Sequence, residues 1–208
     1  MGYLEDGYIT TEATGFDRNK ANVLLIGDSI RMGYCKTVRE KLKDVANVFY
    51  PEENCRNTQN VITRLYAWSK EFPADQIHLI QFNCGHWDVA HWNGYEESLT
   101  SPDEYRRNLL MIIRLLRKLF VNAKLIFATT TVMNPNGSVG VNPRHNDEID
   151  RYNQIAVEVA KAEGVVVNDL NAVTKPYTSD MFRDYCHLTD TAFEELGSKV
   201  AGFLRQMI

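Results

Sequence analysis

Short apolar runs of strand type alternate with longer segments whose apolar residues recur at helical spacing along this 208-residue chain. The predicted strands are 22–27, 45–50, 77–83, 123–130 and 165–169. The predicted helices are 30–43, 57–71, 103–120, 146–163 and 189–207. The clearest helical stripe consists of Leu109, Ile112, Ile113, Leu116 and Phe120.

This alternation predicts an α/β fold, a three-layer α/β/α sandwich around a five-stranded parallel sheet of flavodoxin-like order. We expect one domain over 21–208, because a chain of this length forms one well-packed core and is too short for two large ones. Residues 1–20 are polar and are predicted to form a tail or arm.

Charge and composition narrow the class of partner. The formal net charge is −4 and the charged residues are interspersed without a basic block, so we expect no nucleic-acid partner. No apolar run approaches the ~18 residues of a membrane span, so we expect no membrane partner. The first residues lack a cationic region followed by an apolar stretch. We therefore expect a cytoplasmic protein, unless a signal segment has been removed from this sequence.

The cysteines are scattered, and none forms a C-x-x-C pair. They are Cys35, Cys55, Cys84 and Cys186. This spacing argues against a zinc ribbon or a thioredoxin-like motif, so we expect free thiols. Cys55, Cys84 and Cys186 fall in segments expected to gather at one edge of the sheet, and with His86 and His187 they raise a zinc site as an alternative. Because no two of these residues stand at the usual ligand spacing, we favour packing roles and expect neither a metal nor another cofactor.

Candidate chemistry begins where the first strand ends. The apolar run 22–27 breaks at Gly-Asp-Ser, which places Ser29 at the handover from strand to helix and leaves Asp28 to cap the turn. Near the other end of the chain, Asp184 stands three residues before His187 and can orient its imidazole as a general base. A serine, a histidine and a carboxylate are the minimum set that activates a hydroxyl nucleophile.

Topology predicts that these residues converge. Segments 54–57 and 83–88 follow the second and third predicted strands, as Ser29 follows the first. Because ligands bind beyond the carboxyl ends of parallel strands, we expect these segments to share one rim with Asp184 and His187.

The motifs resemble those of the SGNH, or GDSL-type, hydrolase family from about residue 21 to the end. Gly-Asp-Ser-Ile at 27–30 is similar to the first block of the family, and Asp-x-x-His at 184–187 is similar to its fifth. The resemblance implies that Ser29 is the nucleophile, His187 the general base and Asp184 its orienting partner. It also implies hydrolysis of a small-molecule carboxylic ester through an acyl-enzyme, commonly a short acyl group such as acetyl on a carbohydrate or other polar alcohol.

The middle blocks differ from the family pattern. The family offers a glycine N–H after the second strand and an asparagine side chain in a G-x-N-D segment after the third. Here 53–57 contains no glycine, and Trp87 replaces the asparagine. We expect the oxyanion donors to be the N–H groups of Ser29 and Cys55 and the side chain of Asn83, with the Trp87 indole as an alternative. Loss of one such donor costs about 2.7–4 kcal/mol of transition-state stabilisation.

Several residues of this rim are candidates for contacting the substrate: Arg31, Arg56, His86 and Trp87. Arg31 lies in the first helical turn, where a cation is unfavourable against the helix dipole. An ion pair with Asp88 or Glu53, or an anionic substrate group, would explain its position. His86 and Trp87 form either the aromatic wall of a substrate cleft or ordinary loop packing.

Two long loops and three other functions stay open. Loops 89–102 and 132–145 are expected on the same rim, as lids and specificity elements or as flexible surface loops. The alternatives to ester hydrolysis are acyl transfer, a weakly active or inactive SGNH-like protein that binds a glycan or protein, and a flavodoxin-like phosphate-binding module. The last lacks a glycine-rich loop and leaves Asp184 and His187 unexplained.

Overall fold

The computed structural model describes residues 17–137 and 140–208. The strands are β1 (Ala21–Ile26), β2 (Ala46–Phe49), β3 (Leu79–Phe82), β4 (Lys124–Ala128) and β5 (Val166–Asn168). The helices are α2 (Ser29–Leu42), α3 (Thr58–Glu71), α4 (Pro102–Leu119), α5 (Asn146–Ala162), α6 (Leu170–Thr174) and α7 (Asp190–Arg205). Most of the predicted tail lies outside the described residues. Its end is attached to the sheet, because the Asp17 N–H donates to Asn47 Oδ1 at 2.9 Å.

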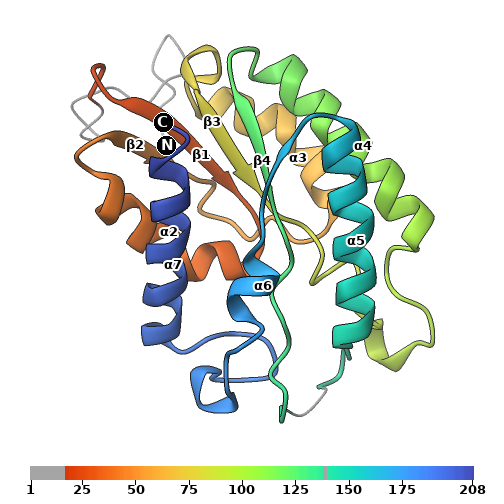
Figure 1. The fold of residues 1–208 in the computed structure, drawn as a ribbon. Helices are drawn as coiled ribbons and strands as arrows, with labels where there is room; N and C mark the ends of the chain where they lie inside the picture. The colour runs from red at the N-terminus through yellow and green to blue at the C-terminus, as the bar shows by residue number, and fades with distance from the viewer. Residues whose placement is uncertain (1–16, 138–139) are drawn as a thin grey trace.

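The five strands form one parallel sheet in the order β2-β1-β3-β4-β5. Helices α2 and α7 lie side by side on one face, and α3, α4 and α5 cover the other (Figure 1). The structure confirms the predicted three-layer architecture and the flavodoxin-like order. The strand order reverses between β1 and β3, so their carboxyl ends bound the crevice in which such sheets place ligands.

The core is built on both faces of the central strand β1. Val23 and Leu25 pack with the residues of α2 and α7, while Leu24 and Ile26 pack with those of α3 and α4. Successive side chains of a strand point to opposite faces, and a strand buried on both faces reads as a continuous apolar run. The Val-Leu-Leu-Ile run in the sequence therefore marks the centre of the sheet.

Local sequence signals set the helix starts. Ser101 and Glu104 form a capping box at the start of α4, and Pro102 occupies the first turn. The strand predicted over 123–130 ends at Ala128, because the chain then leaves the sheet ladder. Past that point the Thr130 N–H donates to the side chain of Asn153 at 2.8 Å. The short helix α6 was not predicted, since five residues do not establish a periodic pattern.

Candidate active site

Ser29 occupies the first position of α2, directly after the tight turn that follows β1. Asp28 is the N-cap of this helix, and its Oδ1 accepts a hydrogen bond from the Ile30 N–H at 3.0 Å. Gly27 has no room for a side chain, because a Cβ there would lie 1.9 Å from Asn83 Oδ1. The Gly-Asp-Ser sequence thus fits a turn that brings the backbone of β1 against the residue after β3.

His187 joins Ser29 to Asp184 through the two nitrogens of its ring. Nε2 lies 2.8 Å from Ser29 Oγ, and Nδ1 lies 2.7 Å from Asp184 Oδ2. The side chains of His187 and Asp184 are 23% and 39% exposed, and Ser29 is half-buried, so a ligand can reach the group. Residues 158 positions apart therefore form one hydrogen-bonded chain at the carboxyl end of the sheet.

Asp184 is held by its own loop. Its Oδ1 accepts hydrogen bonds from the N–H groups of Cys186, at 2.8 Å, and His187, at 2.7 Å. Partial burial acts to raise the pKa of Asp184. The two backbone donors and the His187 ring outweigh it and hold the pKa below the ordinary value of 3.8. The carboxylate is therefore ionised at neutral pH and available to fix the His187 ring.

The Asn83 side chain lies beside the serine turn. Its backbone N–H donates to Ile26 O at 3.0 Å, which continues the pairing of β1 with β3. Oδ1 is sealed from solvent without a hydrogen-bond partner among the described residues, whereas Nδ2 is not among such sealed atoms. Burial raises the pKa of Asp28, and a hydrogen bond from the Asn83 side chain opposes that shift, so the amide donates toward the turn that carries Ser29.

Cys55 is the weakest of the expected oxyanion donors. Its N–H donates to Gly27 O at 3.1 Å, because the chain beyond β2 continues to pair with the chain beyond β1. The residue is fully buried. Contrary to the prediction, Cys55 is not a free oxyanion donor, because its N–H already bonds the backbone oxygen of Gly27.

The structure also corrects the prediction that Arg31 contacts substrate. Arg31 is 1% exposed. Its Nη2 donates to Gly27 O at 3.2 Å and to Glu53 O at 2.6 Å. The guanidinium thus ties the serine turn to the segment after β2. These hydrogen bonds explain why a cation is tolerated in the first turn of α2.

His86 is likewise not an open wall of the rim. It is 3% exposed, its Nε2 lies 3.0 Å from Thr131 Oγ1, and its Nδ1 is sealed without a partner among the described residues. Burial, aided by the positive charge of Arg144, lowers the pKa of His86 to about 3. The imidazole is therefore neutral at physiological pH and lies beneath the surface that a substrate would touch.

Arg56 is exposed on the rim and Trp87 is half-buried there. The Arg56 guanidinium carbon lies 5.8 Å from the centre of the Trp87 ring, and Trp87 lies 5.2 Å from the Trp92 ring. Arg56 has a φ of 55°, in the left-handed region that favours glycine. Its N–H donates to Asn54 Oδ1 at 2.8 Å, which helps to hold this turn. These three side chains form an aromatic and cationic surface beside the serine turn.

Asp88, the last residue of segment 83–88, holds the structure together and does not face the substrate. It is fully buried and accepts hydrogen bonds from the N–H of Thr58, at 3.1 Å, and from its hydroxyl, at 2.6 Å. Burial raises the pKa of Asp88 to about 6, although the Thr58 hydrogen bonds oppose the shift. Asp88 thus anchors the start of α3 to the loop after β3.

The two long loops are tied to the site and to each other. Asn134 donates from its N–H to Tyr185 O at 2.9 Å and from Nδ2 to Asp184 O at 3.1 Å. The His91 N–H donates to Pro143 O at 2.9 Å, which joins loop 89–102 to loop 132–145. Both loops therefore belong to the rim that surrounds Ser29 and His187.

Sequence reasoning missed Arg144, which lies in the second loop. Its Nε donates to His86 O, its Nη1 donates to Asn142 O at 3.2 Å, and the residue is 6% exposed. A single arginine in a loop rich in Asn, Pro and Gly has no spacing that marks it. Its burial depends on how the loop folds over the segment after β3.

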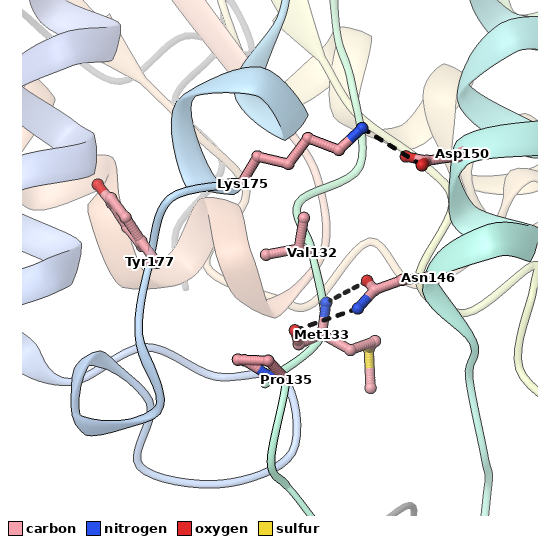
Figure 2. Close-up of a pocket in the computed structure, with 7 residues that line it drawn as sticks. All are labelled: Val132, Met133, Pro135, Asn146, Asp150, Lys175 and Tyr177. Atoms are coloured by element: carbon pink, nitrogen blue, oxygen red, sulfur yellow. Dashed lines mark hydrogen bonds and ion pairs between the residues drawn. The ribbon is translucent and has the colours of Figure 1, made fainter.

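Figure 2 shows what anchors this loop at its base. A hollow of about 130 Å³ is lined by Val132, Met133, Pro135, Asn146, Asp150, Lys175 and Tyr177 (Figure 2). None of these residues was predicted to act on a substrate. Within the hollow, the Met133 N–H donates to Asn146 Oδ1 at 2.8 Å, so the two ends of the loop are clamped together.

The cysteines bear on whether this site could hold a metal ion. All four cysteines are free and buried, as predicted. Within 17–137 and 140–208, the one group of three residues with ligand atoms close enough to hold a metal ion is Asp184, Cys186 and His187. Burial raises the pKa of Cys186 to about 12, so its thiol is protonated at neutral pH. Asp184 and His187 already bond each other, and His187 also bonds Ser29, so these two side chains fit the hydrogen-bonded triad better than a metal centre.

None of the helices in the described part of the chain is long and apolar enough to cross a lipid bilayer.

Comparisons with known proteins define the fold. No family model and no curated protein sequence matches this chain. The structure is similar to that of an acetyl xylan esterase, at 19% identity and a TM-score of 0.71, covering 88% of this chain and 99% of that one. It is similar to a lipase/acylhydrolase from Enterococcus faecalis, at 19% identity and a TM-score of 0.72, covering 90% and 96%. It also matches an aryl esterase of M. Smegmatis, at 12% identity and a TM-score of 0.71, covering 90% and 100%.

This chain shares the fold of these esterase and acylhydrolase structures. The resemblance drawn from the first and fifth sequence blocks is thereby confirmed at the level of the fold.

Proposed function

We propose that this protein hydrolyses carboxylic esters with Ser29 as nucleophile, His187 as general base and Asp184 as its orienting carboxylate. The observation that carries the proposal is the chain of hydrogen bonds from Ser29 Oγ through His187 to Asp184, at 2.8 and 2.7 Å. The likeness of this fold to esterase and acylhydrolase structures supports ester hydrolysis in general. The same site serves acyl transfer when an alcohol replaces water.

The reaction follows from the positions of these groups. Ser29 Oγ attacks the ester carbonyl carbon while His187 Nε2 takes its proton, and Asp184 stabilises the imidazolium that forms. The tetrahedral intermediate breaks its bond to the leaving oxygen, which receives the proton from His187. Water then attacks the acyl-enzyme with His187 again as base, releasing the acid and restoring Ser29.

The oxyanion of the intermediate needs donors close to Ser29. We assign this role to the N–H of Ser29 and to the side-chain Nδ2 of Asn83, with the Trp87 indole N–H as the alternative to Asn83. Cys55 is left out because its N–H donates to Gly27 O. An oxyanion hole with two donors has one fewer than the family pattern. Because each donor is worth about 2.7–4 kcal/mol in the transition state, we expect a slow esterase.

We assign the substrate to short acyl esters of carbohydrates or related polar alcohols. One similar structure is an acetyl xylan esterase, which supports this class. The tilted pair Trp87 and Trp92, with Arg56 beside it, provides aromatic faces and a cation on the rim. Aromatic side chains with polar neighbours suit ligands that are apolar on one face and hydroxylated on the other.

The engaged N–H of Cys55 also favours a second candidate, an SGNH-like protein that binds a glycan with little turnover. The two candidates differ in what the loss of Ser29 does. A binding protein keeps its ligand affinity and has no serine-dependent hydrolysis to lose.

Turnover of 4-nitrophenyl acetate by the wild type, Ser29→Ala and Ser198→Ala tests the proposal. Ser198 donates to Glu194 O within α7, so its substitution is a matched control for removing a serine hydroxyl. We expect Ser29→Ala to reduce turnover to background and Ser198→Ala to retain it, with all three proteins folded by circular dichroism. Turnover that survives Ser29→Ala would contradict the assignment. Acetylated oligosaccharides then serve as the substrate panel.

A further inference from the structure

Arg144 carries a buried positive charge for which no carboxylate partner is found among the described residues. It is 6% exposed, and the ion pairs in the described part of the chain do not include it. Buried charges in proteins are usually paired, because an isolated charge loses its hydration without compensation. The carbonyl oxygens that accept from Arg144 carry only partial negative charge, so they do not neutralise the guanidinium.

The position of Arg144 is fixed by the surrounding structure. Its Nε donates to His86 O and its Nη1 to Asn142 O. Two residues further on, Asn146 clamps the loop to Met133 at the base that Figure 2 shows. The side chain is thus held in place before any ligand arrives, which lowers the entropic cost of binding through it.

Arg144 is linked to the triad through the ring of Tyr185. Its guanidinium carbon is 5.4 Å from the centre of the Tyr185 ring, and that ring is 6.3 Å from the ring of His187. Its positive charge also acts on the pKa of Cys186 and of Asp28, which adjoin His187 and Ser29 in sequence. The charge of Arg144 therefore reaches residues that adjoin the nucleophile and its base in sequence.

Part of the guanidinium remains available. An arginine side chain has five N–H donors, and the two hydrogen bonds to carbonyl oxygens use two of them. Nη2 makes none of the hydrogen bonds found in the described residues, and it is not among the polar atoms sealed from solvent. These free donors form the fork that fits a carboxylate with two parallel hydrogen bonds.

We propose that Arg144 binds an anionic group, a carboxylate, that the ester substrate carries within a few bonds of the scissile carbonyl. The inference rests on the proposed esterase function and narrows its substrate class to acidic esters. Arg144 suits this role better than Arg56, which is exposed and whose charge is screened by water. Asp28 is the nearby buried carboxyl on which the charge of Arg144 acts, but the two side chains form no ion pair.

Binding of matched amide probes tests the proposal without requiring turnover. Calorimetric titrations would compare 4-acetamidobenzoate with 4-acetamidobenzamide. The first carries its carboxylate on the side of the amide bond that corresponds to the alcohol of an ester. A second pair, N-phenylsuccinamate and its primary amide, places the charge on the acyl side. The proteins are the full-length wild type, Arg144→Gln, Arg144→Lys, and Arg114→Gln as a control for an exposed arginine on α4.

We expect the carboxylate member of at least one pair to bind the wild type more tightly than its neutral partner, by roughly tenfold to a hundredfold. Arg144→Gln should remove this preference, Arg144→Lys should reduce it, and Arg114→Gln should retain it. Which pair responds tells on which side of the ester the anion lies.

Three results would overturn the proposal: equal affinity within both pairs, no measurable binding of either carboxylate at millimolar concentration, or a preference that survives in Arg144→Gln. The first two are measured on the wild type, so they decide the question even where Arg144→Gln fails to fold. Failure of the esterase function is a separate result, because it is read from Ser29→Ala with 4-nitrophenyl acetate.

Discussion

At the scale of single residues, each polar group near Ser29 has a distinct use. Asp184 orients His187 and Asp28 caps α2, whereas Asp88 holds the start of α3. Three carboxylates in the same region thus have different roles because their hydrogen-bond partners differ. Two of them, Asp184 and Asp88, lead to predictions that can be measured separately.

Replacing Asp184 with Asn should preserve the fold but reduce kcat/KM for 4-nitrophenyl acetate. The amide can no longer stabilise the imidazolium, and its NH₂ group favours the wrong tautomer of His187. In a serine triad of this kind the loss is about 10⁴-fold. Steady-state kinetics on the variant and on Asp180→Asn, a nearby acidic residue outside the triad, provide the comparison. Equal rates for Asp184→Asn and the wild type would contradict the role of this carboxylate.

Asp88 should make stability depend on pH in the mildly acidic range. Its pKa in the folded protein is raised from 3.8 to about 6, so the folded state keeps a proton that the unfolded state releases. The stabilisation from this group is therefore largest at low pH and is lost as the pH rises from the unfolded to the folded pKa. Urea unfolding at intervals from pH 4 to 7 should show the wild type losing stability relative to Asp88→Asn. Parallel profiles for the two proteins would rule out the shift.

At the scale of elements, the site depends on two connections, the turn from β1 to α2 and the loop from β4 to α5. The turn places Ser29, and the loop carries Arg144 and bonds the segment that holds Asp184. Both connections follow strands near the topological switch of the sheet. Small changes of backbone there should affect the site more than changes on the helices.

Substitution of Gly27 by Ala tests the turn. The added Cβ would lie 1.9 Å from Asn83 Oδ1 and 2.7 Å from Arg31 Cβ, so the turn or Asn83 must move. Overpacking of this kind destabilises by about 1–3 kcal/mol and should also lower esterase activity. Gly202→Ala is the control, because a Cβ at Gly202 meets nothing within 4 Å and α7 should gain stability. A fully stable and active Gly27→Ala protein would contradict the tight approach.

Substitution of Asn134 by Ala tests the tether between the loop and the triad. It removes the hydrogen bond from Nδ2 to Asp184 O and the one that Oδ1 accepts from the Asn136 N–H, while leaving the backbone bond to Tyr185 in place. We expect a small loss of stability, about 0.5–1.5 kcal/mol, and a lower kcat/KM because the loop of Asp184 is held less firmly. Asn136→Ala, in the same loop, serves as control. Identical kinetics for both variants would show that the tether does not position the triad.

At the scale of the whole molecule, the sequence was enough to predict the strand order, the two helical layers and the convergence of Ser29 and His187. Apolar runs and helical spacing determine those features, and right-handed crossovers leave few ways to arrange them. The directions of side chains at the strand ends were not predictable in this way. Arg31, His86 and Cys55 were expected to face the substrate, yet each is buried by contacts with segments distant in sequence.

Arg144 is the opposite case, a residue near the site that the sequence did not predict. Nothing in its local sequence distinguishes it from a surface arginine. Its burial comes from the contact of loop 132–145 with His86 and Tyr185, which only the folded molecule creates. The fold therefore defines the triad that the motifs predict and also a cation that they do not.

The most direct test of the account is covalent labelling of the intact protein with a fluorophosphonate, followed by peptide mass spectrometry. A serine activated by His187 should react, so we predict an adduct on Ser29, absent in Ser29→Ala and much slower to form in His187→Ala. Failure to label folded protein, or an adduct on another serine that persists in Ser29→Ala, would contradict the assignment of Ser29 as an activated nucleophile.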